Sequence, residues 1–127
     1  MLKIEHLPDS TILKTVAHEK LDGADYERLQ PIVEGIIERH GKIRWYFEMN
    51  DFDGWTLDAL WKDAKLSFQH AGDFERIAIV GRKDWMDWMT QLMKPFTSAE
   101  VKYFELEDRE AAMAWIEKSE VVRSSSV

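Results

Sequence analysis

Four aspartates near the middle of the chain are the side chains best placed to do chemistry. Asp51 and Asp53 lie in the stretch KIRWYFEMNDFDGWT, and Asp58 and Asp63 follow it. Paired carboxylates can act as a general acid and a general base, or they can bind a hard cation. Two of the four have simpler explanations, because Asp53 suits a turn and Asp58 suits the first turn of a helix, where the helix dipole favours negative charge.

Other chemical motifs are absent or weak. The four histidines have neither HxH nor HExxH spacing, and they are His6, His18, His40 and His70. The chain has no cysteine, no GxSxG elbow and no glycine-rich phosphate loop of the GxGxxG or GxxxxGKS type. Gly81-Arg82-Lys83 follows a predicted strand and could hold an anion, although a solvated basic turn is the commoner explanation.

We therefore expect a protein without enzymatic activity, metal or cofactor. No serine, threonine or lysine lies in a pattern that pairs a nucleophile with its base. A zinc site assembled in space stays open as a minor alternative. An enzyme that uses the neighbourhood of Asp53, Asp63 and His70 also stays open, because the sequence separations neither forbid nor predict a shared pocket.

Composition and charge describe one acidic globular domain. The chain has 127 residues with 45% hydrophobic content, enough for a core, and its net charge is −7. That charge argues against non-specific binding to nucleic acid, because Lys and Arg must replace the counterions of the phosphates. The start MLKIEHLPDS lacks a signal-peptide pattern, and no apolar run reaches the about 20 residues that span a bilayer. We expect a cytoplasmic protein with one domain over residues 1–120 and a disordered tail over residues 121–127.

The elements that must position these side chains are organised around one central strand. Residues 43–49 form a nearly continuous apolar run, which is typical of a strand buried on both faces. Residues 50–54, NDFDG, predict a turn after this strand, and Thr56 can cap the helix that follows it. The residues expected on one apolar face of that helix are Leu57, Leu60, Trp61, Ala64 and Phe68.

Strands and helices alternate along the rest of the chain. Two short strands at the start predict an antiparallel hairpin, and Asp22 can cap the first helix, which Pro31 should kink or begin and Gly41 should end. The remaining expected elements are strands at residues 2–5, 11–20, 75–81 and 101–106, a helix at about residues 84–96, and a last helix capped by Asp108 that buries Ala111, Ala112, Trp115 and Ile116. This alternation predicts an α/β fold with right-handed crossovers on a mixed, mostly parallel sheet.

The most unusual pattern is the tryptophan- and methionine-rich helix RKDWMDWMTQLMKPF, which is apolar on one face and polar on the other. An ordinary amphipathic helix packed on a sheet is the commoner source of such a pattern. However, methionine adapts to exchangeable partners and tryptophan favours boundaries between apolar and wet surroundings. The helix could therefore gate an apolar pocket or lie on a membrane surface. The expected ligand-binding residues are Trp55, Trp61, Phe68, Trp85, Met86, Trp88, Met89, Met93 and Phe96.

A series of short motifs spreads over almost the whole chain in a fixed order. They are Asp25-Tyr26, Gly41-Lys42-Ile43-Arg44, Phe52-Asp53-Gly54, Trp61-Lys62-Asp63 with His70, Arg76 to Gly81, Trp85, Ala99-Glu100-Val101, Phe104, and the spacing from Ala111 to Trp115. In this order and spacing the chain resembles the SpoIIAA-like family, small bacterial α/β proteins related in fold to STAS domains and to Sec14/CRAL-TRIO lipid-binding domains. The resemblance implies about five strands, about four flanking helices and no established catalytic residues.

The resemblance leads to two expected functions. The first is a non-enzymatic binding domain for a small apolar or lipid-like molecule, gated by the tryptophan- and methionine-rich helix, which would also contact membranes peripherally. The alternative is a regulatory protein-interaction module of the STAS type that docks a protein partner or a second copy. STAS anti-anti-sigma factors place a phosphorylatable Ser or Thr after an Asp at the turn following the central strand. Here Asp53 is followed by Gly54 and Trp55, so that acceptor is missing.

Overall fold

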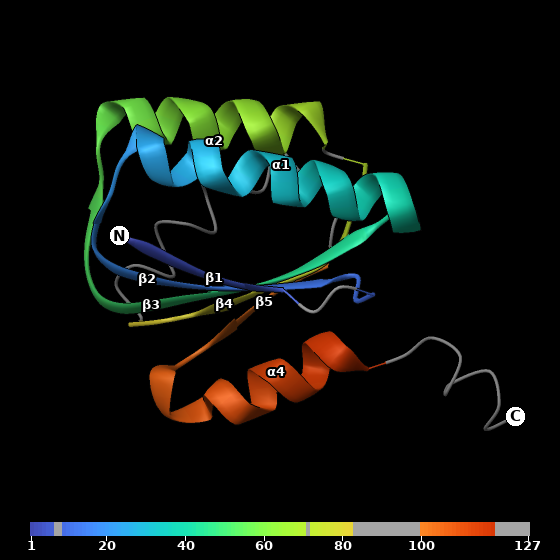
Figure 1. The fold of residues 1–127 in the computed structure, drawn as a ribbon. Helices are drawn as coiled ribbons and strands as arrows, with labels where there is room; N and C mark the ends of the chain where they lie inside the picture. Colours follow the sequence, from blue (N-terminus) through green and yellow to red (C-terminus); the bar gives the residue numbers. More distant parts are fainter. Residues whose placement is uncertain (7–8, 71, 83–99, 119–127) are drawn as a thin grey trace, which may run out of the picture.

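Five strands form one sheet at the centre of the protein (Figure 1). The computed structural model describes residues 1–6, 9–70, 72–82 and 100–118, apart from the side chains of residues 51–53, 55, 57, 60, 64, 67 and 68. In sheet order the strands are β1 (Leu2–His6), β2 (Ile12–Leu21), β3 (Ile43–Trp55), β4 (Phe74–Val80) and β5 (Glu100–Phe104). β1 pairs antiparallel with β2, and all other neighbours pair in parallel. The predicted mixed sheet with an N-terminal hairpin is confirmed.

Helices cover the two faces of this sheet. Figure 1 shows α1 (Gly23–His40) and α2 (Leu57–Gln69) on one face and α4 (Arg109–Glu117) on the other, after the short 3₁₀ turn η2 (Leu106–Asp108). The described residues contain three α-helices, fewer than the about four that the resemblance implied. The helix expected at residues 84–96 and the tail expected at 121–127 lie outside the described residues.

The core lies mainly between the sheet and the α1–α2 layer. The predicted apolar run of β3 is confirmed, because every residue from Ile43 to Met49 is buried. The Trp45 indole stacks on Phe74 with the ring centroids 5.9 Å apart, and its Nε1 donates a hydrogen bond to Thr15 Oγ1 at 2.9 Å. An indole N–H needs a partner when it is buried, so this polar contact lets Trp45 fill the centre of the core.

The ends of α1 follow from local sequence. The Asp22 carboxylate accepts a hydrogen bond from the backbone N–H of Asp25, and the Asp25 carboxylate accepts one from Asp22, which together make a capping box. Gly41 closes the helix in the left-handed conformation, with φ of 76°. Both predicted ends are confirmed. Pro31 lies inside one continuous helix, so it does not begin the main body of α1.

β3 runs on through the stretch that predicted a turn. Residues 50–54 belong to the strand, and Trp55 at its end lies opposite Leu21 of β2, so the turn prediction is wrong. The pairing contains register shifts, and the backbone has positive φ angles at Gly54 (118°) and Glu19 (54°). Pairing with β2 therefore overrides the local preference of Asn, Asp and Gly for a turn. Bulge-like irregularities in the pairing accommodate these residues within the strand.

The last helix differs from its prediction in two ways. Asp108 stands at the N-cap position of α4, as predicted, but it also belongs to η2 and its side chain makes no capping hydrogen bond. Ala112 and Ile116 are buried as predicted, Trp115 is partly buried, and Ala111 is exposed. The buried stripe of α4 is narrow because a nine-residue helix meets the sheet along one line only.

Two buried arginines hold the C-terminal end of α4 on the sheet. Arg44 of β3 and Arg76 of β4 both donate through Nη1 to the carbonyl oxygen of Lys118. The same nitrogen of Arg44 donates to Ile116 O at 3.0 Å, and that of Arg76 donates to Trp115 O at 3.2 Å. The last carbonyls of a helix have no partner within the helix, and cations are favoured there, so these arginines replace an ordinary C-cap.

Candidate functional site

The junction between β3 and α2 lies at the edge of the sheet where ligands of open α/β folds gather. Thr56 Oγ1 accepts a hydrogen bond from the backbone N–H of Ala59 at 3.1 Å, which confirms the predicted cap. The backbone N–H of Thr56 donates to the carbonyl oxygen of Leu21 at 2.8 Å. The hydroxyl group nearest to the STAS phosphorylation position is therefore engaged in starting α2.

Trp61 is the most exposed large apolar side chain among the described residues. It is 70% exposed, whereas Ala59 and Leu66 of the same helix are buried. At 3.6 residues per turn, Trp61 lies on the opposite side of α2 from those two residues. Trp61 is therefore not packed in the core, and the other residues expected on its face, Leu57, Leu60, Ala64 and Phe68, have side chains outside the description.

Ion pairs hold α2 against α1 next to Trp61. Lys62 Nζ lies 2.8 Å from Glu27 Oε1 of α1 and 3.6 Å from Asp58 Oδ2 of its own helix. The hydrogen bond from Lys62 lowers the pKa of Glu27. A Cβ atom on Gly23 would lie 1.7 Å from Asp58 Oδ2, so the start of α1 closely approaches α2. Trp61 therefore projects from a helix that lies closely against α1.

Asp63 is a partly buried carboxyl group on α2. Burial raises its pKa to about 6, although a hydrogen bond from the Tyr26 hydroxyl of α1 acts in the opposite direction. A carboxyl group that titrates near neutral pH is frequent at acid–base sites but also occurs where a helix interface buries it. The tyrosine partner and the position between α1 and α2 fit the second case.

His70 is paired separately from Asp63. Its Nδ1 lies 3.1 Å from Asp73 Oδ2, and its Nε2 lies 3.8 Å from Glu34 Oε1. Asp53, the third member of the possible enzyme site, has its side chain outside the description. Within the parts of the chain that the structure describes, no three His, Asp or Glu side chains are arranged to hold a metal ion. The described contacts therefore do not bring Asp63 and His70 into a common site.

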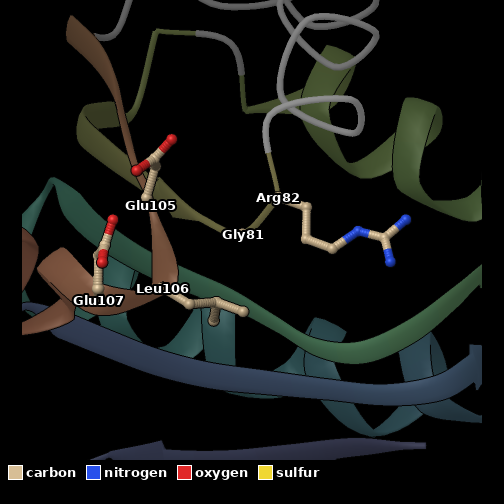
Figure 2. Close-up of a pocket in the computed structure, with 5 residues that line it drawn as sticks. All are labelled: Gly81, Arg82, Glu105, Leu106 and Glu107. Carbon is tan, nitrogen blue, oxygen red and sulfur yellow. The ribbon is translucent and has the colours of Figure 1, made fainter.

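A cavity of about 410 Å³ lies where β4 and β5 end (Figure 2). Gly81, Arg82, Glu105, Leu106 and Glu107 line it. Figure 2 shows the two glutamates on one side, with the Arg82 side chain pointing away from them. A shared hydrogen bond with Glu105 and the negative charges nearby raise the pKa of Glu107. This concentration of carboxylates makes the cavity a poor anion site. Lys83, the second cation of the anion site that the sequence left open, lies outside the described residues.

The structure describes one side chain of the expected apolar ligand site. The three cavities whose linings lie wholly within the described residues do not include Trp61. The side chains of Trp55 and Phe68 lie outside the description, and so do all residues of the tryptophan- and methionine-rich helix. The expected members that fall there are Trp85, Met86, Trp88, Met89, Met93 and Phe96. The apolar-ligand site therefore stays a prediction.

Sequence reasoning missed a buried polar cluster on the α4 side of β3. The Tyr46 hydroxyl donates a hydrogen bond to Glu48 Oε1 at 2.6 Å, and both residues are buried. Burial and the neighbouring carboxylate raise the pKa of Tyr46 well above its usual range. The available signal was the polar side chains Arg44, Tyr46 and Glu48 at every second position of an otherwise apolar strand, because such positions share one face.

The comparisons with known proteins agree with this geometry. The SpoIIAA-like family model matches residues 12–117, and the chain belongs to the SpoIIAA-like family. A solved structure, an uncharacterised protein of the DUF3478 family with a SpoIIAA-like fold from Shewanella loihica PV-4, is 34% identical in sequence. It has a TM-score of 0.69, and the match covers 91% of this chain and 92% of that chain. No curated protein matches the chain.

These comparisons confirm part of the expected kinship. The SpoIIAA-like family and the five-stranded α/β fold are confirmed, whereas neither comparison supports a relation to CRAL-TRIO domains. None of the helices in the described ranges combines the length and the apolar composition needed to cross a bilayer.

Proposed function

We propose that this protein is a non-enzymatic, SpoIIAA-like interaction module that docks a protein partner through α2, with Trp61 as the anchor. The main observation behind this proposal is that the Trp61 side chain is 70% exposed. Burying an exposed indole in an interface would contribute about 2–3 kcal/mol of favourable free energy. Tryptophan is also the residue type most enriched among the few side chains that dominate binding at protein interfaces.

The surroundings of Trp61 support a protein partner over an apolar small molecule. Asp58 and Lys65 are exposed on the same helix, so the indole lies among charged groups. Interfaces of transient complexes commonly place an aromatic anchor inside a polar rim. A partner would need an apolar pocket for the indole and complementary charges around it.

The module would work without phosphorylation at the STAS position. Asp53 is followed by Gly54 and Trp55, and the nearby Thr56 hydroxyl accepts the capping hydrogen bond of α2. Phosphorylation of Thr56 would require that cap to break. We therefore expect docking that depends on concentration and on the Trp61 surface rather than on a phosphate switch.

Differential capture from a native lysate tests the proposal. The wild-type protein, Trp61→Ala and the control Gln69→Ala, an exposed position two turns away on α2, are immobilised, and the captured proteins are compared. We expect at least one protein that binds the wild type and Gln69→Ala but not Trp61→Ala. With that protein purified, Trp61→Ala should weaken Kd by about 30-fold or more, the effect of losing an interface hot spot.

Three outcomes would overturn the proposal. Identical captured sets for the wild type and Trp61→Ala would show that Trp61 anchors nothing. Concentration-dependent dimerisation that Trp61→Ala abolishes would make a second copy the occupant of this surface. Binding to phosphatidylcholine vesicles that Trp61→Ala abolishes would instead favour membrane contact, as the apolar-ligand prediction requires.

A further inference from the structure

An open groove runs beside α4 over the N-terminal hairpin. Two cavities of about 480 and 430 Å³ lie on this face of the sheet, and both are lined by Glu5, Lys14 and Met113. α4 packs on the neighbouring strands through Ala112 and Ile116, which contact the buried side chains of β3 and β4. Cavities of this size suit small molecules. The groove lies on the opposite face of the sheet from α2, so the inference drawn from it is independent of the proposed function.

The wall of the smaller cavity contains a buried carboxylate. Glu48 lines this cavity, yet its side chain is only 6% exposed. One oxygen, Oε1, accepts the hydrogen bond from the Tyr46 hydroxyl at 2.6 Å. The other oxygen, Oε2, has no hydrogen bond from any described residue, and its nearest cation is Arg109 Nη1 at 3.8 Å.

This arrangement leaves room for a second positive group. No described buried side-chain oxygen or nitrogen lacks a hydrogen-bond partner, so Oε2 must be open to the solvent of the cavity. Arg109 is 50% exposed and therefore holds Glu48 only weakly. A buried carboxylate gains most from a close charged hydrogen bond, because the low dielectric strengthens that bond. An ammonium group in the cavity would supply it.

A cation lines the same cavity as Glu48. Lys14 of β2 is the register partner of Tyr46, two residues before Glu48 on the same face of β3. The Lys14 ammonium lies 3.7 Å from Glu5 Oε2 and 5.7 Å from the centre of the Tyr46 ring, so it borders the cavity with only a loose carboxylate partner.

We propose that this groove binds a small zwitterion whose ammonium group pairs with Glu48 and whose carboxylate group pairs with Lys14. The Tyr46 ring also lines this cavity and lies 5.7 Å from the Lys14 ammonium, so it offers an apolar wall for a methylene chain between the ligand charges. An ω-amino acid has this form.

Titration with three probes of equal chain length tests the charge assignment. 6-Aminohexanoate, hexylamine and hexanoate are added to the ¹⁵N-labelled protein, and amide shifts are followed by NMR. We expect 6-aminohexanoate to bind at least tenfold more tightly than hexylamine, with shifts in β1, β2, β3 and α4, and hexanoate to bind weakest. Equal affinity for 6-aminohexanoate and either single-charge probe would overturn the proposal, and so would the absence of binding by 6-aminohexanoate.

Matched variants test the two residues. Glu48→Gln keeps an acceptor for Tyr46 and should weaken 6-aminohexanoate binding by about tenfold to a hundredfold, the range of a charged hydrogen bond. Glu110→Gln is the control, because Glu110 lines the same cavity from the exposed side of α4. Lys14→Gln should weaken binding by about tenfold. Its control is Lys3→Gln, because Lys3 also lines the cavity and lies near Glu5, at 3.8 Å, but on the edge strand.

Circular dichroism melts confirm that each variant is folded. Unchanged affinity in folded Glu48→Gln or in folded Lys14→Gln would overturn the proposal. A loss of affinity in the two controls as large as in Glu48→Gln and Lys14→Gln would also overturn it, because general surface charge would then explain the binding. If Glu48→Gln does not fold, Lys14→Gln with its Lys3→Gln control decides the outcome.

Discussion

At the scale of single residues, this protein places its polar groups inside the fold with specific partners. Thr15 lies in the core and accepts a hydrogen bond from the Trp45 indole. Glu48 lies beneath α4 and accepts one from the Tyr46 hydroxyl. A buried polar group without a partner costs about 1–3 kcal/mol, so each of these pairs constrains the side chains around it. Single substitutions of such polar residues should therefore change the free energy of unfolding measurably.

Thr56→Ala should destabilise the protein by about 1 kcal/mol, because it removes the oxygen that accepts the Ala59 N–H at the start of α2. Thr56→Ser is the matched control, since serine keeps that oxygen, and it should stay close to the wild type. Urea unfolding followed by circular dichroism measures both variants. Equal stability of Thr56→Ala and the wild type would contradict the assignment of Thr56 as the cap.

Asp63 should make stability fall as the pH rises. Its pKa in the folded protein is raised to about 6, above the ordinary aspartate value of 3.8, so between these values the folded state binds more protons than the unfolded state. The contribution of the neutral carboxyl group is therefore fully present below about pH 4 and lost as the pH rises through 6.

Asp63→Asn isolates this effect, because the amide stays neutral and still accepts the hydrogen bond from Tyr26. The difference in unfolding free energy between Asp63→Asn and the wild type should grow in favour of the variant from pH 4 to pH 7. Urea unfolding at several pH values measures it. A constant difference across that range would show that Asp63 titrates at its ordinary pKa.

At the scale of elements, helix ends are set locally at the start of the chain and by tertiary contacts at its end. α1 has its own capping box and a left-handed glycine, whereas α4 has no side-chain cap and ends on Arg44 and Arg76. A short helix without local caps depends on packing for its stability. The attachment of α4 should therefore be sensitive to those two arginines.

Arg44→Gln should destabilise the protein by about 3 kcal/mol, because it removes a buried partner of Glu75 and of the last carbonyls of α4. Lys42→Gln is the control, since Lys42 Nζ also pairs with Glu75, at 3.4 Å, but is 66% exposed. It should cost no more than about 0.5 kcal/mol. Hydrogen exchange should be faster in α4 of Arg44→Gln, and equal protection of α4 in both variants would contradict this view.

At the scale of the whole molecule, one sheet joins two surfaces with different chemistry. α1 and α2 cover one face and α4 covers part of the other (Figure 1). The first layer presents the exposed Trp61 indole, and a groove lined by charged residues lies beside α4. The buried side chains of β3 contact both layers, because alternate residues point to opposite faces. Neither layer has a core without this sheet.

The wild-type protein should therefore unfold in one transition. Far-UV circular dichroism and tryptophan fluorescence should give the same urea midpoint, because loss of the sheet removes the support of both helix layers. Two separated midpoints would show that one layer is stable after the other is lost.

The sequence alone determined the features that depend on short-range physics. The apolar run of β3, the Asp22 and Thr56 caps, the Gly41 helix end and the N-terminal hairpin follow from side-chain polarity, local hydrogen bonding and backbone preference. The SpoIIAA-like resemblance also came from motif order along the chain.

The tertiary structure decided what depends on neighbours distant in sequence. Pairing with β2 turned the predicted turn at residues 50–54 into strand, and the packing of α2 left Trp61 in solvent. The arginines beneath α4 were not predicted, because Arg44 and Arg76 meet the last carbonyls of α4 only when β3 and β4 lie side by side under that helix. Tyr46 and Glu48 are neighbours on one face of β3, but only the packing of α4 on that face decides that the pair is buried. Local patterns specify where an element starts and ends, but long-range contacts specify which of its faces is buried.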